Sequence, residues 1–119
     1  QDRPARELEI DRVVRALGVE DVCVIDPNDL DAVRSALKEA TMATERLSVL
    51  IFKRPCVLLS RERTEPYFVA NCTGCGVCIS LGCPAIGKES ETGLAYIDAD
   101  MCIGCGQCAQ YCRFNAIVR

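Results

Sequence analysis

The sequence predicts an α+β chain in which a partial α/β layer is followed by a small cysteine-rich domain. Two features of the chain lead to this prediction. Before residue 59, apolar residues at helical spacing alternate with short runs of β-branched residues. After residue 67, eight of the ten cysteines lie between residues 72 and 112. We therefore expect an α/β part over residues 1–59, a polar linker over 60–66 and a cysteine-rich domain over 67–119.

The α/β part is expected to run helix, strand, helix, strand. Residues 10–17 and 30–40 each place their apolar side chains on one face of a helix. Residues 22–25 and 48–52 are short apolar runs typical of buried strands, and Cys23 is expected to be a small buried hydrophobe in the first of them. Two strands make a thin sheet with open edges, so we expect this part to be the end of a larger α/β domain.

Composition excludes several functional classes. The net charge is −3, from 14 Lys and Arg against 17 Asp and Glu, which argues against a nucleic-acid partner. The chain has no His, so a Ser-His-Asp triad, a Cys-His nucleophile and a His-rich zinc site are absent. No catalytic pair of carboxylates is recognisable, and we assign no catalytic residue. No apolar run reaches the roughly 18 residues of a membrane span, so no membrane partner is expected. The first residue is Gln1 rather than Met, which suggests a fragment or a processed product.

The eight clustered cysteines form two similar sets. In each set, three cysteines separated by two residues are followed by a fourth, and the sets are Cys72, Cys75, Cys78 and Cys83, then Cys102, Cys105, Cys108 and Cys112. Three thiols so closely spaced cannot all find disulfide partners among themselves. Thiolates are, however, the ligands that iron–sulfur clusters select. The spacing matches the bacterial C-x2-C-x2-C-x3-C-P pattern, in which the fourth cysteine ligates the other cluster.

We therefore expect two [4Fe–4S] clusters. Cluster I would be bound by Cys72, Cys75, Cys78 and Cys112, and cluster II by Cys102, Cys105, Cys108 and Cys83. The alternative is a pair of zinc knuckles, although structural zinc sites usually separate two C-x2-C pairs by a longer spacer. The cysteine-rich domain has little conventional core, so we expect it not to fold without iron and sulfide.

Several residues around the cysteines carry expectations of their own. Glycines between the cysteines are expected to adopt unusual φ values, and they are Gly74, Gly76, Gly104 and Gly106. Four residues rather than three separate Cys78 from Cys83, and Gly82 is expected to absorb the extra one as a local bulge. Arg113 replaces the proline of the pattern, and it either raises the potential of cluster I or points into water. Cys56 is open to an additional role as a ligand or redox thiol.

The segments that carry a family resemblance are the two cysteine loops, Leu17-Gly18-Val19 through Val24-Ile25-Asp26-Pro27 and Asp29-Leu30, and Arg54-Pro55-Cys56-Val57-Leu58. Together they resemble the C-terminal part of the large (alpha) subunit of indolepyruvate:ferredoxin oxidoreductases. The resemblance implies that residues 1–59 are the end of a thiamine-diphosphate-binding domain and that residues 67–119 form a two-[4Fe–4S] ferredoxin-like domain. The family oxidatively decarboxylates arylpyruvates with coenzyme A and passes the electrons to ferredoxin.

The same resemblance implies cofactors and partners beyond the clusters. Thiamine diphosphate and Mg would bind only in the full-length subunit, because no G-D-G motif followed by Asn occurs here. The chain alone is then not catalytic and relays electrons, with ferredoxin as acceptor and a smaller beta subunit as partner. Ten free thiols suit a reducing cytoplasm. A free-standing dicluster ferredoxin that docks on another redox enzyme is the alternative redox interpretation.

Overall fold

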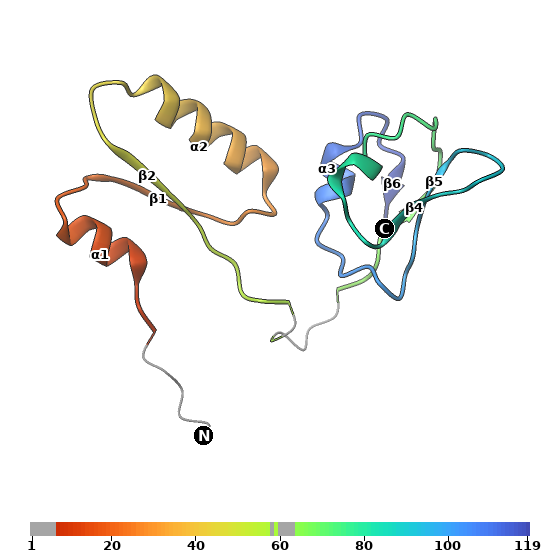
Figure 1. Cartoon of the computed structure of the whole chain (residues 1–119), viewed down its shortest axis with the longest axis horizontal. Coiled ribbons are helices and arrows are strands. Elements are labelled where there is room, and N and C mark those ends of the chain that lie inside the picture. The colour runs from red at the N-terminus through yellow and green to blue at the C-terminus, as the bar shows by residue number, and fades with distance from the viewer. Residues whose placement is uncertain (1–6, 58, 60–63) are drawn as a thin grey trace. The chain divides into compact units, whose positions relative to one another are not determined.

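The computed structural model describes residues 7–57, 59 and 64–119. The chain divides into two compact units, Gln1–Arg54 and Pro55–Arg119, and together they give the mixed α+β composition that was predicted. Each unit is drawn in Figure 1. Of the predicted linker, residues 60–63 lie outside the described part of the chain, and the linker bounds stay a prediction. No helix in the described residues is long and apolar enough to cross a membrane.

The first unit has the predicted order of elements. They are α1 (Ile10–Ala16), β1 (Asp21–Ile25), α2 (Leu30–Met42) and β2 (Ser48–Phe52). The two strands pair in parallel, with Asp21 opposite Ser48 and Ile25 opposite Phe52, because α2 carries the chain back to the starting edge. The carboxylate of Asp29 accepts a hydrogen bond from the Ala32 amide at 3.0 Å and so caps α2. In Figure 1 the two helices lie on opposite sides of the strands.

The first unit has very little core. Among its described residues only Ile25 is buried, whereas large apolar side chains are exposed on both helices and both strands, including Leu17, Val24, Leu37 and Phe52. The prediction that Cys23 is buried is wrong, since its side chain is exposed. A β-branched run predicts the strand correctly, but burial also requires a layer packed over that face of the strand, which no local pattern specifies.

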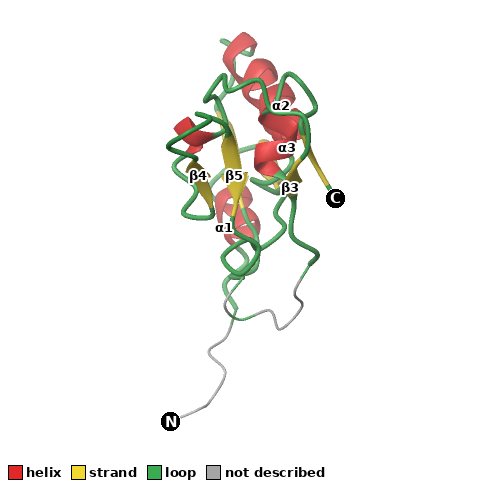
Figure 2. Ribbon diagram, turned by 90° about the vertical axis from the view of Figure 1, so that its right-hand side faces the viewer, coloured by secondary structure: helices red, strands yellow, loops and turns green. Residues whose placement is uncertain are grey.

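The second unit contains six short elements. They are β3 (Phe68–Val69), the 3-10 turn η1 (Ile79–Leu81), β4 (Ile86–Lys88), β5 (Ala95–Ile97), α3 (Gln107–Tyr111) and β6 (Ile117–Val118), several of which are labelled in Figure 2. The sequence predicts short strands over residues 67–69, 95–97 and 116–118, before each cysteine loop and at the end of the domain, and the structure contains them as β3, β5 and β6. The strand β4 and the two short helical turns were not predicted.

The sequence repeat is also a structural repeat, and its two halves interlock. Each half consists of a strand, a cysteine loop, a helical turn and a second strand. The first strand of each half pairs antiparallel with the last strand of the other, β3 with β6 and β5 with β4. Cys83 lies just before β4 and Cys112 just before β6, so each fourth cysteine is carried back to the opposite half.

A segment of the chain covers the second cysteine loop. The Thr64 hydroxyl donates to the Ile103 carbonyl at 2.6 Å. The Arg119 guanidinium donates to the Gly104 carbonyl at 2.7 Å and lies 4.5 Å from the centre of the Tyr67 ring. Gly104 itself leaves no room for a side chain, because a Cβ there would clash with the Thr64 hydroxyl and lie 2.6 Å from the Glu65 carbonyl oxygen.

This close approach predicts different effects for two glycine substitutions. Gly76 and Gly104 both have positive φ, at +74° and +66°, so alanine at either costs about 1–2 kcal/mol in backbone strain. Only Gly104→Ala adds a clash, because nothing lies within 4 Å of a Cβ at Gly76. We expect Gly104→Ala to lower the denaturant midpoint of the iron-loaded chain clearly more than Gly76→Ala. Equal shifts of the denaturant midpoint would show that residues 64–65 do not contact the second loop closely.

Candidate functional site

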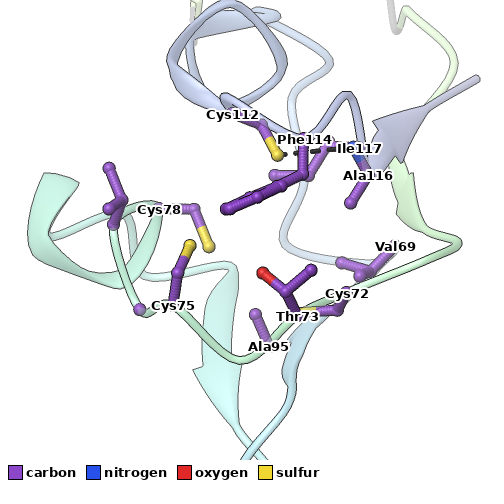
Figure 3. Close-up of a pocket in the computed structure, with 12 residues that line it drawn as sticks. Val69, Cys72, Thr73, Cys75, Cys78, Ala95, Cys112, Phe114, Ala116 and Ile117 are labelled. Atoms are coloured by element: carbon purple, nitrogen blue, oxygen red, sulfur yellow. Dashed lines mark hydrogen bonds between the residues drawn. The ribbon is translucent and has the colours of Figure 1, made fainter.

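A cavity in the second unit brings together the first three cysteines of one set and the last of the other. Its lining includes Cys72, Cys75, Cys78 and Cys112, with apolar contacts from both halves. Figure 3 shows the sulfurs of Cys75 and Cys78 beside each other, Cys112 across the cavity, and the Phe114 ring lying between. The pairing of β3 with β6, which exchanges strands between the two halves of the repeat, explains this arrangement. This strand exchange places β6 next to β3 and brings Cys112 near the first loop.

The remaining four cysteines are grouped by their mutual electrostatics. Cys108 is buried, and burial is the main reason that its pKa is raised to about 11. The negative charges that the thiolates of Cys105, Cys102 and Cys83 would carry raise it further. The Asp98 amide donates to the Ala85 carbonyl at 2.8 Å and the Cys102 amide donates to the Asp98 carbonyl at 2.9 Å, so the segment after Cys83 lies beside the start of the second loop. This is the fourfold set expected for cluster II.

The first set shows the same electrostatic pattern. The pKa of Cys78 is raised, chiefly by burial and then by Cys72, Cys75 and Cys112 as like charges. In both sets, therefore, burial raises the pKa of the third cysteine and favours its protonated form when no metal is present. Binding a metal would displace that proton and stabilise the thiolate. Thiols placed in this way are suited to a positively charged partner that all four of them share.

A zinc site and an iron–sulfur cluster make different demands on the positions of the thiols. Within residues 7–57, 59 and 64–119, no three His, Cys, Asp or Glu side chains are grouped so that they could hold one metal ion. A tetrahedral zinc site, with Zn–S bonds of about 2.3 Å, needs its sulfurs within about 4 Å of one another. In an iron–sulfur cluster each thiolate binds a different iron, so the sulfurs stand further apart. Four thiols that line one cavity, Cys72, Cys75, Cys78 and Cys112, are the donor type that such a cluster requires.

Backbone amides donate to two of the sulfurs. The Gly74 amide donates to the Cys72 sulfur and the Ala116 amide to the Cys112 sulfur, each at 3.3 Å. Donors of this kind stabilise the more negative state of a thiolate-bound cluster. Asn115 is the one described residue other than glycine with positive φ, at +51°, and it immediately precedes the donating Ala116 amide. Asn tolerates this left-handed conformation better than most residues.

The expectations for the glycines are confirmed. The four between the cysteines all have positive φ, with Gly74 at +72°, Gly76 at +74°, Gly104 at +66° and Gly106 at +79°. Gly82, at φ +68°, ends η1, and its amide donates to the Ile79 carbonyl. The extra residue of the first set is therefore taken up by a left-handed turn immediately before Cys83, as predicted.

Three residues outside the two sets can also be placed. Cys56 is exposed and is not part of the cavity lining. Arg113 is exposed and makes no hydrogen bond or ion pair with any described residue. Phe114 is not predicted from the sequence as a site residue, yet it lines the cavity although it is 54% exposed. Its position directly between Cys112 and the β6 strand is a signal that could have identified it.

Comparison with known proteins supports the nature of this site. A family of 4Fe-4S binding domains matches residues 95–118. The indolepyruvate oxidoreductase subunit IorA of Pyrococcus horikoshii is 40% identical over 95% of this chain, and that of Thermococcus kodakarensis is 37% identical over 93%. An uncharacterised ferredoxin of Methanocaldococcus jannaschii is 47% identical over 30% of the chain.

The matches to the IorA subunits cover nearly all of this chain but only a small part of each relative. The chain spans only 19% and 18% of the two IorA subunits and 22% of the ferredoxin. No solved structure matches the chain. The chain is thus homologous to one segment of IorA subunits, and it contains a 4Fe-4S binding domain within that segment.

Proposed function

We propose that this chain transfers electrons through two [4Fe–4S] clusters as a module of an indolepyruvate-type 2-oxoacid:ferredoxin oxidoreductase subunit. The observation that carries the proposal is the exchange of fourth cysteines, which gives two complete sets of four thiols. Cluster I is bound by Cys72, Cys75, Cys78 and Cys112, which line one cavity. Cluster II is bound by Cys102, Cys105, Cys108 and Cys83, which are coupled electrostatically.

The protein holds and tunes the redox groups. When bound, each cluster supplies the ability to accept and release one electron at a time. The buried side chains of Ala95 and Ile117 keep water from part of the first cavity, and this disfavours added negative charge. The amides of Gly74 and Ala116 act in the opposite direction by donating to sulfurs. The potential of cluster I reflects the balance of these two effects.

The extent of the match favours a subunit over a free-standing ferredoxin. The IorA subunits match this chain across both of its units, whereas the ferredoxin matches 30% of it. The exposed apolar side chains of the first unit, such as Val24 and Phe52, also suit a unit that packs on further protein. We infer that this unit completes a thiamine-diphosphate-binding domain whose cofactor and Mg are bound elsewhere in a longer subunit.

The wider setting of this function follows from the same assignment. The electrons would come from oxidative decarboxylation of an arylpyruvate and pass to ferredoxin as the acceptor. A smaller beta subunit would complete the enzyme. A cytoplasmic location suits ten cysteines, none of which forms a disulfide in the described structure.

Removing either crossing cysteine is expected to eliminate one cluster and spare the other. Anaerobically reconstituted wild-type chain should contain about eight irons and eight sulfides, and Cys83→Ala or Cys112→Ala about four of each. Electron paramagnetic resonance of the reduced variants should then show one isolated paramagnet instead of two that interact. Cys56→Ala is the matched control, because Cys56 is an exposed cysteine outside both sets, and it should retain the full count.

Two results would contradict the proposed function. A colourless chain that contains zinc and does not respond to dithionite would support the knuckle alternative. A Cys56→Ala chain with half the iron of wild type would show that the cysteine ligands are assigned incorrectly.

Removing the clusters is expected to unfold the second unit. Its described core consists of two cysteines and four small or medium apolar residues, Cys78, Cys108, Ala85, Ala95, Ala116 and Ile117. So small a core cannot offset the conformational entropy of the chain without metal. After chelation, amide hydrogen exchange over residues 68–118 should rise to the level of an unfolded peptide. Protection that survives in β3, β5 and β6 would refute this expectation.

A further inference from the structure

The two cysteine loops share one sequence pattern but differ in how far solvent reaches them. In the second loop Gly104 and Gly106 are buried, and Thr64, Tyr67 and Arg119 cover that loop. In the first loop the matching Gly74 is exposed, as is Cys75, which is itself a predicted ligand. The chain therefore covers the second loop with its own residues, whereas Cys75 of the first loop is the one exposed cysteine in the two sets.

The residues two positions after the fourth cysteines also differ in solvent exposure, and again the one beside the first set is the more exposed. Ala85 lies two residues after Cys83 and is 2% exposed. Phe114 lies two residues after Cys112, is 54% exposed and still lines the cavity of the first set. An aromatic ring beside a redox site with half its surface in water is a feature that suits contact with another protein.

These residues define a small surface, which we call the exchange face. It consists of Thr73, Cys75 and Phe114, which are all exposed and all line the cavity, together with the exposed Arg113, which immediately precedes Phe114 in the chain. Arg113 has no anionic partner among the described residues. The exchange face thus offers an apolar centre and one unpaired cation.

We propose that the external electron carrier docks on the exchange face and that electrons pass to it from the cluster held by residues 72–78. This inference rests on the proposed function and adds the route by which electrons leave the chain. The rate of electron tunnelling falls exponentially with distance, so the less covered cluster is the one a carrier can approach closely. The cation at Arg113 selects a carrier with carboxylates around its own cluster.

The electron step requires no other reactant. One electron leaves the reduced [4Fe–4S] cluster of this chain, which becomes oxidised, and the oxidised cluster of the carrier becomes reduced. No bond forms or breaks, and no proton moves. The second set, Cys102, Cys105, Cys108 and Cys83, would hold the cluster that supplies the electron for the next transfer.

The test compares variants on the two loops in the iron-loaded chain. The prereduced chain is mixed in a stopped-flow instrument with an oxidised, acidic two-[4Fe–4S] ferredoxin, and the dissociation constant of the oxidised pair is measured by calorimetry. Phe114→Ala and Arg113→Glu should each lower the second-order rate and weaken binding, Arg113→Glu by about tenfold at low salt. That loss should shrink at high ionic strength, because salt screens exposed charges.

The matched control is Ile103→Ala. Ile103 is an apolar residue of the second loop that is 51% exposed, close to the 54% of Phe114. This variant should transfer electrons and bind the ferredoxin like wild type. Iron, sulfide and cluster potentials are measured in every variant, so that a damaged cluster is not mistaken for a damaged docking surface.

The outcomes separate the two proposals. If the wild-type chain holds no clusters, the proposed function fails and the route fails with it. If wild type transfers electrons but Ile103→Ala slows transfer as much as Phe114→Ala, or Arg113→Glu has no salt-dependent effect, only the route is overturned. A loaded chain that dimerises through Phe114 and cannot bind the carrier also overturns it.

Discussion

The strand exchange in the second unit is the constraint on which its other features depend. Because β3 pairs with β6 and β4 with β5, neither half of the repeat completes a sheet within itself. The same exchange carries Cys112 to the first loop and Cys83 to the second. The backbone hydrogen bonds thus determine which thiols face one another, and the cysteine spacing alone does not. A change in the register of the two-residue ladder between β3 and β6 would move Cys112 away from the first loop.

The energetic role of the cysteines differs from that of an ordinary core. Cys78 and Cys108 are buried where a small domain would normally place aliphatic side chains. Burial raises the pKa of both thiols, so each would resist ionisation in the absence of metal. Bound iron would reverse that preference, since a thiolate ligand is stabilised by the positive charge of the metal. Under the proposed ligand sets, folding and cluster binding would be coupled through the same two side chains.

Much of the architecture could be predicted from local patterns, and the errors have physical causes. Periodicity and β-branched runs located α1, α2, β1 and β2, because these signals act within a few residues. The strand β4 was missed because it is three residues long and contains a glycine, and it is recognisable only once Tyr96 is seen to pack over Gly87. The cover over the second loop joins Thr64 to Ile103, a contact between residues far apart in the sequence. The exposure of Cys23 depends on what lies over the sheet, which no local pattern encodes.

The interlocked repeat also bears on how such a domain could arise. A single half would contain three thiols of one set and a fourth thiol that belongs to the other set. It could therefore complete a set of four only by pairing with a second copy. Joining the copies in one chain converts that bimolecular encounter into an intramolecular one, with a high effective concentration at any dilution. Tandem duplication would thus make assembly independent of protein abundance. It would also free the two copies to diverge, as Ala85 and Phe114 have done at equivalent positions.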